Sequence, residues 1–146
     1  MKTAYALLRK GKYFVQSYSR TTTGIWIASG PVHVVEEGSA DELGIKLRDA
    51  LNGSLEGISH PSQAGWKAVQ APMLAAAGVK TWTTLAKGSK SVGIELVGDV
   101  VKFIPSSDYA NRGGKSHPEQ AVESRFDSNN LGQSLIQAFD ACDQGR

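Results

Sequence analysis

Residues 39–51 read Ser-Ala-Asp-Glu-Leu-Gly-Ile-Lys-Leu-Arg-Asp-Ala-Leu, and residues 127–139 read Asp-Ser-Asn-Asn-Leu-Gly-Gln-Ser-Leu-Ile-Gln-Ala-Phe. The apolar residues of both stretches recur at i, i+4, i+7 and i+8, which is the spacing of an amphipathic helix. The chain therefore contains one helical pattern twice, at an offset of 88 residues (131 minus 43). The residues that match between the two copies are Leu43 and Leu131, Gly44 and Gly132, Leu47 and Leu135, and Ala50 and Ala138.

Short runs rich in aromatic and β-branched residues precede the first of these helices, and such runs are typical of strands. Residues 9–12 (Arg-Lys-Gly-Lys) predict a turn after the first run, and Ser29-Gly30-Pro31 predicts a turn before the last. Ser39 followed by Glu42 predicts a capping box, and Asn52-Gly53 predicts the end of the helix. The predicted strands are residues 4–8, 13–18, 24–28 and 32–36.

The second half of the chain begins with the same plan. Residues 91–96 alternate in hydrophobicity, and Gly98-Asp99 predicts a hairpin turn into a return strand at 100–105. Residues 106–118 are polar and contain glycine, which predicts a long surface loop. A final strand at 120–126 leads into the second helix. The apolar positions of the first strands are also offset by 88 residues, so strands and helices repeat in one register.

The middle of the chain, residues 54–88, has no counterpart in the second half. Apolar residues at helical spacing predict a helix from about Trp66 to Ala77, kinked or divided at Pro72. Residues 81–86 predict another short helix or a turn. We therefore expect one α+β domain over residues 1–146. It consists of two β-meander-then-helix pseudo-repeats, 1–53 and 89–146, joined by the helical connector 54–88. Since neither half can bury an apolar face alone, both helices should pack against antiparallel sheets in a pseudo-twofold body, a plan that resembles the Whirly class of single-stranded-DNA-binding folds.

Composition limits the classes of function. A formal net charge of +2, from 16 basic and 14 acidic residues, disfavours a protein built mainly to bind nucleic acid. The single cysteine, Cys142, excludes an internal disulfide framework and fits a buried, inert thiol. No apolar run approaches the roughly 18 residues of a membrane span, and the N-terminus lacks the pattern of a signal peptide. We expect a cytoplasmic protein without membrane contact.

Candidate catalytic and metal-binding residues are few. His33, His60 and His117 have no metal-ligand spacing and fit surface histidines better than a general base. There is no nucleophile elbow and no acid–base constellation, so we expect no catalytic residue, metal or cofactor and no enzyme activity. The basic turn at 9–12 could contact phosphate, although a solvated hairpin tip is the better explanation.

Trp26, Trp66 and Trp82 fit packing roles. Ile25 and Ile27 should take the core face of their strand, which would point Trp26 to the other face and make it a possible partner site.

Taken as a whole, the chain resembles the immunity proteins of bacterial contact-dependent growth inhibition (CDI) systems. The resemblance runs nearly end to end, and its motifs define a scaffold rather than a site. The residues that carry it are Tyr5 with Gly11-Lys12-Tyr13-Phe14, residues 19–26 (Ser-Arg-Thr-Thr-Thr-Gly-Ile-Trp), Leu43-Gly44 with Leu47 and Ala50-Leu51, His60-Pro61 with Trp66, residues 78–82 (Gly-Val-Lys-Thr-Trp), residues 101–105 (Val-Lys-Phe-Ile-Pro), and Leu131-Gly132 with Phe139.

The resemblance implies a small cytoplasmic protein that binds the C-terminal toxin domain of a cognate secreted effector, often a nuclease, and inhibits it stoichiometrically. Binding residues vary within such families, so none is transferred. From this sequence alone we select Glu36, Glu37, Tyr109 and Arg112 as candidate toxin contacts, the first two because carboxylates suit a basic partner and the others because they lie in the predicted loop. The alternative function is a single-stranded nucleic-acid-binding module, although we expect no direct nucleic-acid partner.

Overall fold

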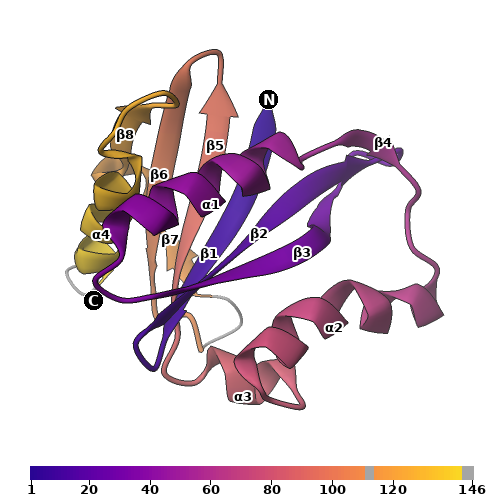
Figure 1. Ribbon diagram of the computed structural model, residues 1–146. Coiled ribbons are helices and arrows are strands. Elements are labelled where there is room, and N and C mark those ends of the chain that lie inside the picture. Colours follow the sequence, from indigo (N-terminus) through magenta and orange to yellow (C-terminus); the bar gives the residue numbers. More distant parts are fainter. Residues whose placement is uncertain (111–113, 143–146) are drawn as a thin grey trace.

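The structure is a computed structural model, and it describes residues 1–110 and 114–142. In this part of the chain a largely antiparallel sheet is covered by helices on both faces (Figure 1). The strands are β1 (Lys2–Arg9), β2 (Lys12–Thr21), β3 (Trp26–Glu36), β4 (Glu56–Ile58), β5 (Lys90–Val97), β6 (Val100–Ser107), β7 (Lys115–Ser116) and β8 (Val122–Arg125). The helices are α1 (Ala40–Asn52), α2 (Trp66–Ala77), α3 (Trp82–Ala86) and α4 (Leu131–Cys142), with 3-10 turns η1 (Gln63–Gly65) and η2 (Pro118–Gln120).

The two halves of the chain meet at the centre of the sheet. The strand order is β3-β2-β1-β5-β6, and β7 and β8 both pair with β6. β1 and β5 pair antiparallel, with Ala4 opposite Ile94 and Ala6 opposite Val92. One side of this junction therefore holds β1–β3 followed by α1, and the other holds β5–β8 followed by α4. The finer predictions, that the halves are true repeats and that the plan is Whirly-like, stay predictions.

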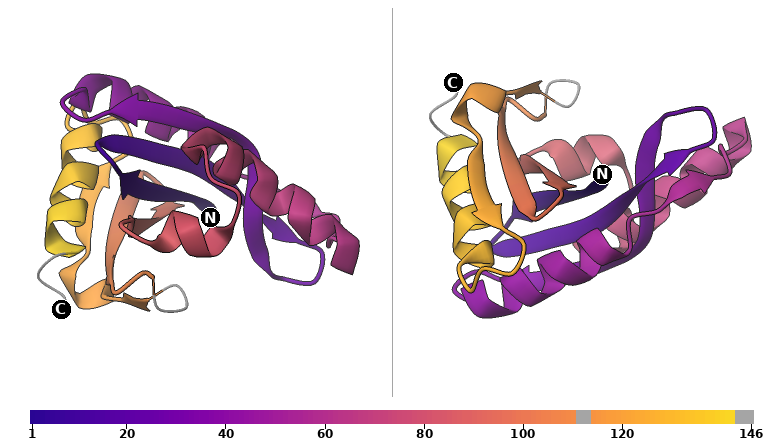
Figure 2. Two further views of the ribbon diagram at one scale, coloured as in Figure 1. Left: turned by 90° about the horizontal axis from the view of Figure 1, so that it is seen from below. Right: turned by 90° about the horizontal axis from the view of Figure 1, so that it is seen from above.

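Successive side chains of β1 point to opposite faces of the sheet, and the two faces have separate hydrophobic cores. Ala4 and Ala6 point to a core that contains the buried residues of α1 and α4, whereas Leu7 points to a second core with Phe14, Met73 and Leu85. Accordingly, α1 and α4 cover one face of the sheet, and α2 and α3 cover the other (Figure 2). The mixed α+β class predicted from the sequence is confirmed.

The repeated helical pattern forms the contact between α1 and α4. A Cβ atom on Gly44 would lie 3.3 Å from the backbone nitrogen of Gly132, so the matched glycines let the two backbones approach closely. Gly53 follows the end of α1 as predicted, but the capping box is wrong, because Ser39 makes no side-chain hydrogen bond to the helix. All matched apolar positions are buried: Leu43, Leu47, Ala50, Leu51, Leu131, Leu135, Ala138 and Phe139.

The separate strands predicted at 24–28 and 32–36 are one strand, β3. Its register against β2 shifts between Gln16, which faces Val32, and Ser17, which faces Ser29. Gly30 has a φ of +72° and bulges out of the ladder instead of turning the chain. The Gln16 side chain holds the bulge by donating from Nε2 to the Gly30 carbonyl at 2.9 Å. The turn signal of Ser29-Gly30-Pro31 therefore marks a bulge in an edge strand.

The orientation predicted at the start of β3 is also partly wrong. Ile27 is buried, but Ile25 lies before the strand and is 47% exposed. Trp26 is half-buried rather than exposed, on the side of the sheet that α2 covers. The loop predicted at 106–118 contains the end of β6, all of β7 and the start of η2, and four of its described side chains are well buried: Ser106, Ser107, Tyr109 and His117.

Candidate functional site

Two of the four candidate contact residues lie together on the surface. Glu36 ends β3 and Glu37 follows it, and both are exposed. The Glu37 backbone N–H donates to the Gly11 carbonyl at 3.0 Å, which fixes this corner against the β1–β2 turn. The other two candidates differ, because Tyr109 is only 6% exposed and Arg112 lies outside the described residues.

Glu36 and Glu37 belong to a larger group of carboxylates, which we call the acidic corner: Glu36, Glu37, Asp41 and Glu42. All four side chains are exposed, and no basic residue interrupts residues 36–42. Asp41 and Glu42 occupy the first turn of α1, where the helix dipole stabilises negative charge. The acidic corner therefore groups four exposed carboxylates between the end of β3 and the first turn of α1.

The basic turn at 9–12 lies directly beside the acidic corner. Lys12 is the cross-strand neighbour of Glu36, and Gly11 is bonded to Glu37. Neighbouring carboxylates repel phosphate and offset the turn's positive charge. The structure thus weakens the suggestion that this turn binds nucleic acid.

Positive charge collects in another part of the chain. Residues 57–94 contain Lys67, Lys80, Lys87 and Lys90 and no carboxylate. These residues include α2, α3 and the start of β5, whereas the acidic corner lies at the start of α1. The stretches 36–42 and 57–94 therefore carry opposite charge, although the basic turn at 9–12 lies beside the first of them.

Tyr109 is buried and belongs to a cluster of rings on the α2–α3 side of the sheet, together with the half-buried Tyr5 and Tyr18. The ring centroids of Tyr5 and Tyr18 are 5.4 Å apart, and those of Tyr5 and Tyr109 are 6.4 Å apart. Burial raises the pKa of the Tyr18 hydroxyl to about 12, and it also raises the pKa values of Tyr5 and Tyr109 above the usual 10. These hydroxyls stay neutral over the physiological range and act as packing groups.

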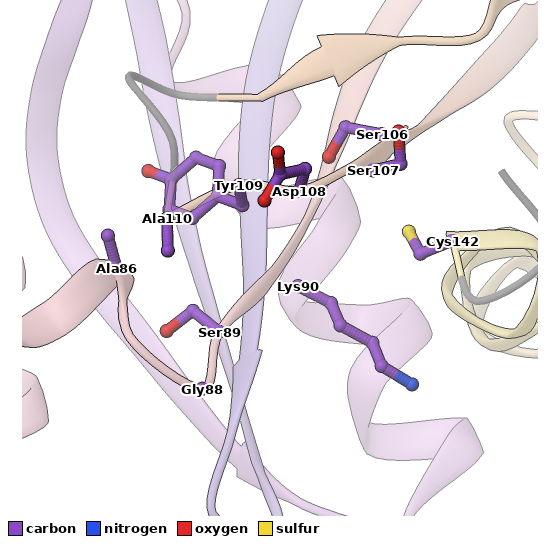
Figure 3. A pocket seen from close by; sticks show the side chains of 10 residues that line it. All are labelled: Ala86, Gly88, Ser89, Lys90, Ser106, Ser107, Asp108, Tyr109, Ala110 and Cys142. Carbon is purple, nitrogen blue, oxygen red and sulfur yellow. The ribbon is translucent and has the colours of Figure 1, made fainter. Parts of the chain in front are cut away.

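A pocket of about 580 Å³ lies between the end of β6, the start of β5 and the last residue of α4 (Figure 3). Its wall combines apolar and polar residues: Ser89 and Lys90 come from the start of β5, Asp108 follows the end of β6, and the Cys142 sulfur approaches from the α4 end (Figure 3). Cys142 itself is 3% exposed, which confirms the buried thiol expected from the sequence.

Three side chains next to this pocket form a hydrogen-bonded series. Ser107 Oγ lies 2.7 Å from His117 Nε2, and His117 Nδ1 lies 3.2 Å from the Glu119 carboxylate. The order of groups is that of a serine-hydrolase triad, but the carboxylate of a triad is buried and Glu119 is 66% exposed. Ser107 itself is only 8% exposed. The series therefore fastens η2 to β6, and His117 is a buried structural histidine rather than the surface histidine predicted.

The remaining histidines and candidate metal ligands add no second site. His60 Nδ1 hydrogen-bonds the Thr23 hydroxyl at 2.8 Å, and its ring meets Trp66 edge-on. Within residues 1–110 and 114–142, no group of histidine, cysteine and acidic side chains could hold a metal ion. Nor does any described helix have the length and hydropathy to cross a membrane.

Comparison with known sequences decides the family. The sequence model of the CDI immunity proteins matches residues 2–142, which is nearly the whole chain. The chain belongs to the CDI immunity protein family. Membership implies an inhibitor rather than an enzyme, in agreement with the structural role of the Ser107–His117 pair. No curated protein sequence matches the chain.

Two solved structures share the fold of this immunity protein. A protein of unknown function from Neisseria meningitidis has a TM-score of 0.78 at 18% identity, covering 97% of this chain and 94% of its own. A toxin–immunity complex, CdiA-CT/CdiI, from Yersinia pseudotuberculosis gives a TM-score of 0.77 at 19% identity, covering 97% of each chain. At these identities the likeness concerns the fold, and the binding residues of this immunity protein must come from its own surface.

Sequence reasoning missed two clusters in this immunity protein. The Ser107–His117–Glu119 series was hidden because its members lie in a stretch with the composition of a polar loop. The three tryptophans fit separate packing roles in the sequence, although all of them line one pocket. Their spacing of 40 and 16 residues matches no motif, so only the fold reveals that they converge.

Proposed function

We propose that this immunity protein binds the cognate CdiA-CT toxin domain and neutralises it by stoichiometric inhibition inside the cytoplasm. We propose further that the toxin is a nuclease and that the whole chain, 1–146, acts as one domain. The observation that carries the proposal is the family match over residues 2–142. The Yersinia toxin and immunity complex, which contains the same fold, supports it.

We place the first contact of the toxin at the acidic corner. Nucleases commonly carry positive charge for their substrate, and a complementary negative surface speeds their association with an inhibitor. The chain as a whole is slightly basic, but the separation of charge described above gives it such a surface. Glu36 and Glu37 carry this part of the proposal, because Tyr109 is buried and Arg112 lies outside the described residues.

Reversing the charge of the corner should slow toxin binding. For the double variant Glu36→Lys/Glu37→Lys we expect the association rate constant to fall about tenfold or more at low salt, with a weaker dependence on ionic strength. Stopped-flow mixing of the immunity protein with a catalytically inactive toxin domain measures both quantities.

The matched control is Asp99→Lys/Glu123→Lys, which makes the same change of net charge next to β6 and in β8. This control should leave the rate close to that of the unmodified chain. Equal slowing by both double variants would show that only net charge matters. An unchanged rate for Glu36→Lys/Glu37→Lys would show that the toxin does not first contact the acidic corner.

The alternative of a single-stranded nucleic-acid-binding module has less support. Its predicted contact, the turn at 9–12, lies against Glu36 and Glu37. Absence of binding to single-stranded oligonucleotides at low salt would exclude it, since such binding is strongest there.

A further inference from the structure

The three tryptophans of the chain converge on one hollow. Trp26 comes from β3, Trp66 from the first residue of α2 and Trp82 from the first residue of α3. Together they line a pocket of about 170 Å³ between the β2–β3 part of the sheet and α2. We call it the tryptophan pocket, and its other lining residues are Gln16, Tyr18, Ile27, Ala28, Val69, Gln70 and Met73.

The rings of this pocket are incompletely buried. Trp66 is 36% exposed, and Trp26 and Trp82 are half-buried. Large aromatic side chains contribute most when water is fully excluded from them, as in the centres of protein interfaces. The volume is smaller than the roughly 300–1,000 Å³ typical of drug-sized ligands. The pocket therefore suits a single inserted side chain.

Gln16 gives the pocket a polar side. This residue is only 1% exposed, and its Nε2 donates to the Gly30 carbonyl at 2.9 Å. Because a carbonyl can only accept, that bond fixes which end of the amide is nitrogen. The Gln16 Oε1 atom is closed off from solvent and has no hydrogen-bond partner among the described residues. A guest therefore reaches it only when a neighbouring side chain changes rotamer, as interface side chains commonly do on binding. Buried acceptors are almost always paired, so this oxygen calls for a donor.

The chemistry of the wall selects a neutral donor. None of the ten lining residues is charged, and residues 57–94, which include α2 and α3, contain no carboxylate. A lysine or arginine side chain would lose its hydration in this pocket without meeting a counter-charge, which is unfavourable. A carboxylate would meet an acceptor where it needs a donor. An aromatic side chain with an O–H or N–H group satisfies both the apolar walls and Gln16.

We infer that the tryptophan pocket receives a tyrosine or tryptophan side chain of the cognate toxin domain, whose hydroxyl or indole N–H donates to Gln16 as the guest enters between the indole rings. The inference rests on the proposed function for the identity of the partner. It adds an anchoring contact on the α2 side of the sheet that is separate from the acidic corner.

The chain offers a specific probe of this contact, because all three of its tryptophans line the pocket. We propose to label the immunity protein with 5-fluorotryptophan and record its fluorine NMR spectrum while unlabelled, inactive toxin domain is added. At one equivalent we expect the resonance of Trp66, at the rim, and at least one other to shift. A stoichiometric complex in which all three resonances keep their positions would overturn the inference and leave the proposed function intact. Failure to form any complex would instead contradict the proposed function, and this inference with it.

A matched pair of variants tests the energetic contribution. Trp66→Ala should weaken toxin binding at least tenfold, mainly through faster dissociation. The control Val97→Ala removes another exposed apolar side chain, in β5 at the hairpin with β6, and should change affinity less than threefold. Both positions are exposed, so both variants should fold, which circular dichroism verifies. Equal affinity of Trp66→Ala and the unmodified chain would contradict the inference.

Small probes test the choice of guest without the toxin. N-acetyl-tyrosinamide should shift the fluorotryptophan resonances at lower concentration than N-acetyl-phenylalaninamide, which differs only by lacking the donor hydroxyl. Equal titration curves for the two amides would remove the role of Gln16. Adenosine, titrated in parallel, should shift the resonances less than the tyrosine amide does. A larger shift with adenosine would contradict a protein guest and would indicate that the pocket binds a nucleobase.

Discussion

Replacing Gly132 by alanine should destabilise the protein by about 2 kcal/mol or more, the range seen for overpacked cores. A Cβ atom at this position would collide with the Ala40 carbonyl oxygen and lie 3.0 Å from the Gly44 backbone nitrogen. Both obstacles are backbone, so relief requires α1 and α4 to move apart. Alanine favours an isolated helix over glycine by roughly 1 kcal/mol, so intrinsic propensity predicts the opposite sign. Urea unfolding followed by circular dichroism measures the change.

The matched control is Gly93→Ala in β5, where an added Cβ atom meets nothing within 4 Å. Its free energy of unfolding should stay within about 1 kcal/mol of the unmodified protein. Gly44→Ala should have an intermediate effect, because its Cβ atom would approach the Gly132 nitrogen at 3.3 Å. A Gly132→Ala variant as stable as the unmodified chain would show that α1 and α4 are not packed as described.

Raising the pH above 10 should unfold the protein cooperatively. Burial raises the pKa values of Tyr5, Tyr18 and Tyr109, and that of Tyr18 reaches about 12, against an unfolded value near 10. The neutral phenols therefore favour the folded state below pH 10, and this stability is lost as the pH rises from 10 to 12. For Tyr18 alone the loss is about 3 kcal/mol, at 1.36 kcal/mol per pKa unit. This loss of stability is of the same order as the one expected for Gly132→Ala.

Absorbance at 295 nm and circular dichroism, recorded on the same samples, test this prediction. Tyrosine ionisation and loss of secondary structure should occur in the same pH interval. Tyr18→Phe removes one of the titrating groups and should move the midpoint to higher pH. Ionisation of all four tyrosines near pH 10 in a chain that keeps its native spectrum would contradict the burial of the cluster.

The helices and most strand positions could be predicted from the sequence because local periodicity reflects burial. The repeated pattern around Gly44 and Gly132 predicted both core-facing helices and most of the apolar positions that they bury. Hairpin turns such as Gly98-Asp99 were found because their chemistry is local, and β5 indeed ends at Val97 while β6 begins at Val100. What the pattern did not give was the contact between the two glycines, which depends on how the halves meet.

The errors arose where tertiary structure changes the meaning of a local signal. Gly30-Pro31 is ordinarily a turn, but here an edge strand accommodates it as a bulge that the Gln16 side chain holds in place. The sequence around Ser107 and His117 is polar and typical of a loop. The hydrogen bond between these two side chains nevertheless holds both residues buried against β6. Neither outcome follows from propensity, because each depends on a partner more than nine residues away.

The candidate site was only partly accessible to sequence reasoning. Glu36 and Glu37 are exposed as expected of paired glutamates before a helix, since the helix dipole and solvent both favour them there. Tyr109 was selected for its polar neighbours, but its ring completes a buried cluster with Tyr5 and Tyr18. The separation of charge between residues 36–42 and 57–94 is visible in the sequence, and it becomes meaningful only once the fold places the two regions on different elements.

The most direct test of the proposed function is a titration of the toxin's activity. The immunity protein would be co-purified with the cognate CdiA-CT domain, separated from it, and added back in measured amounts while the toxic activity is followed. The proposed mechanism predicts a stable complex and a linear loss of activity that reaches zero at one equivalent. A toxin domain that stays fully active in excess immunity protein, with no complex in solution, would contradict it.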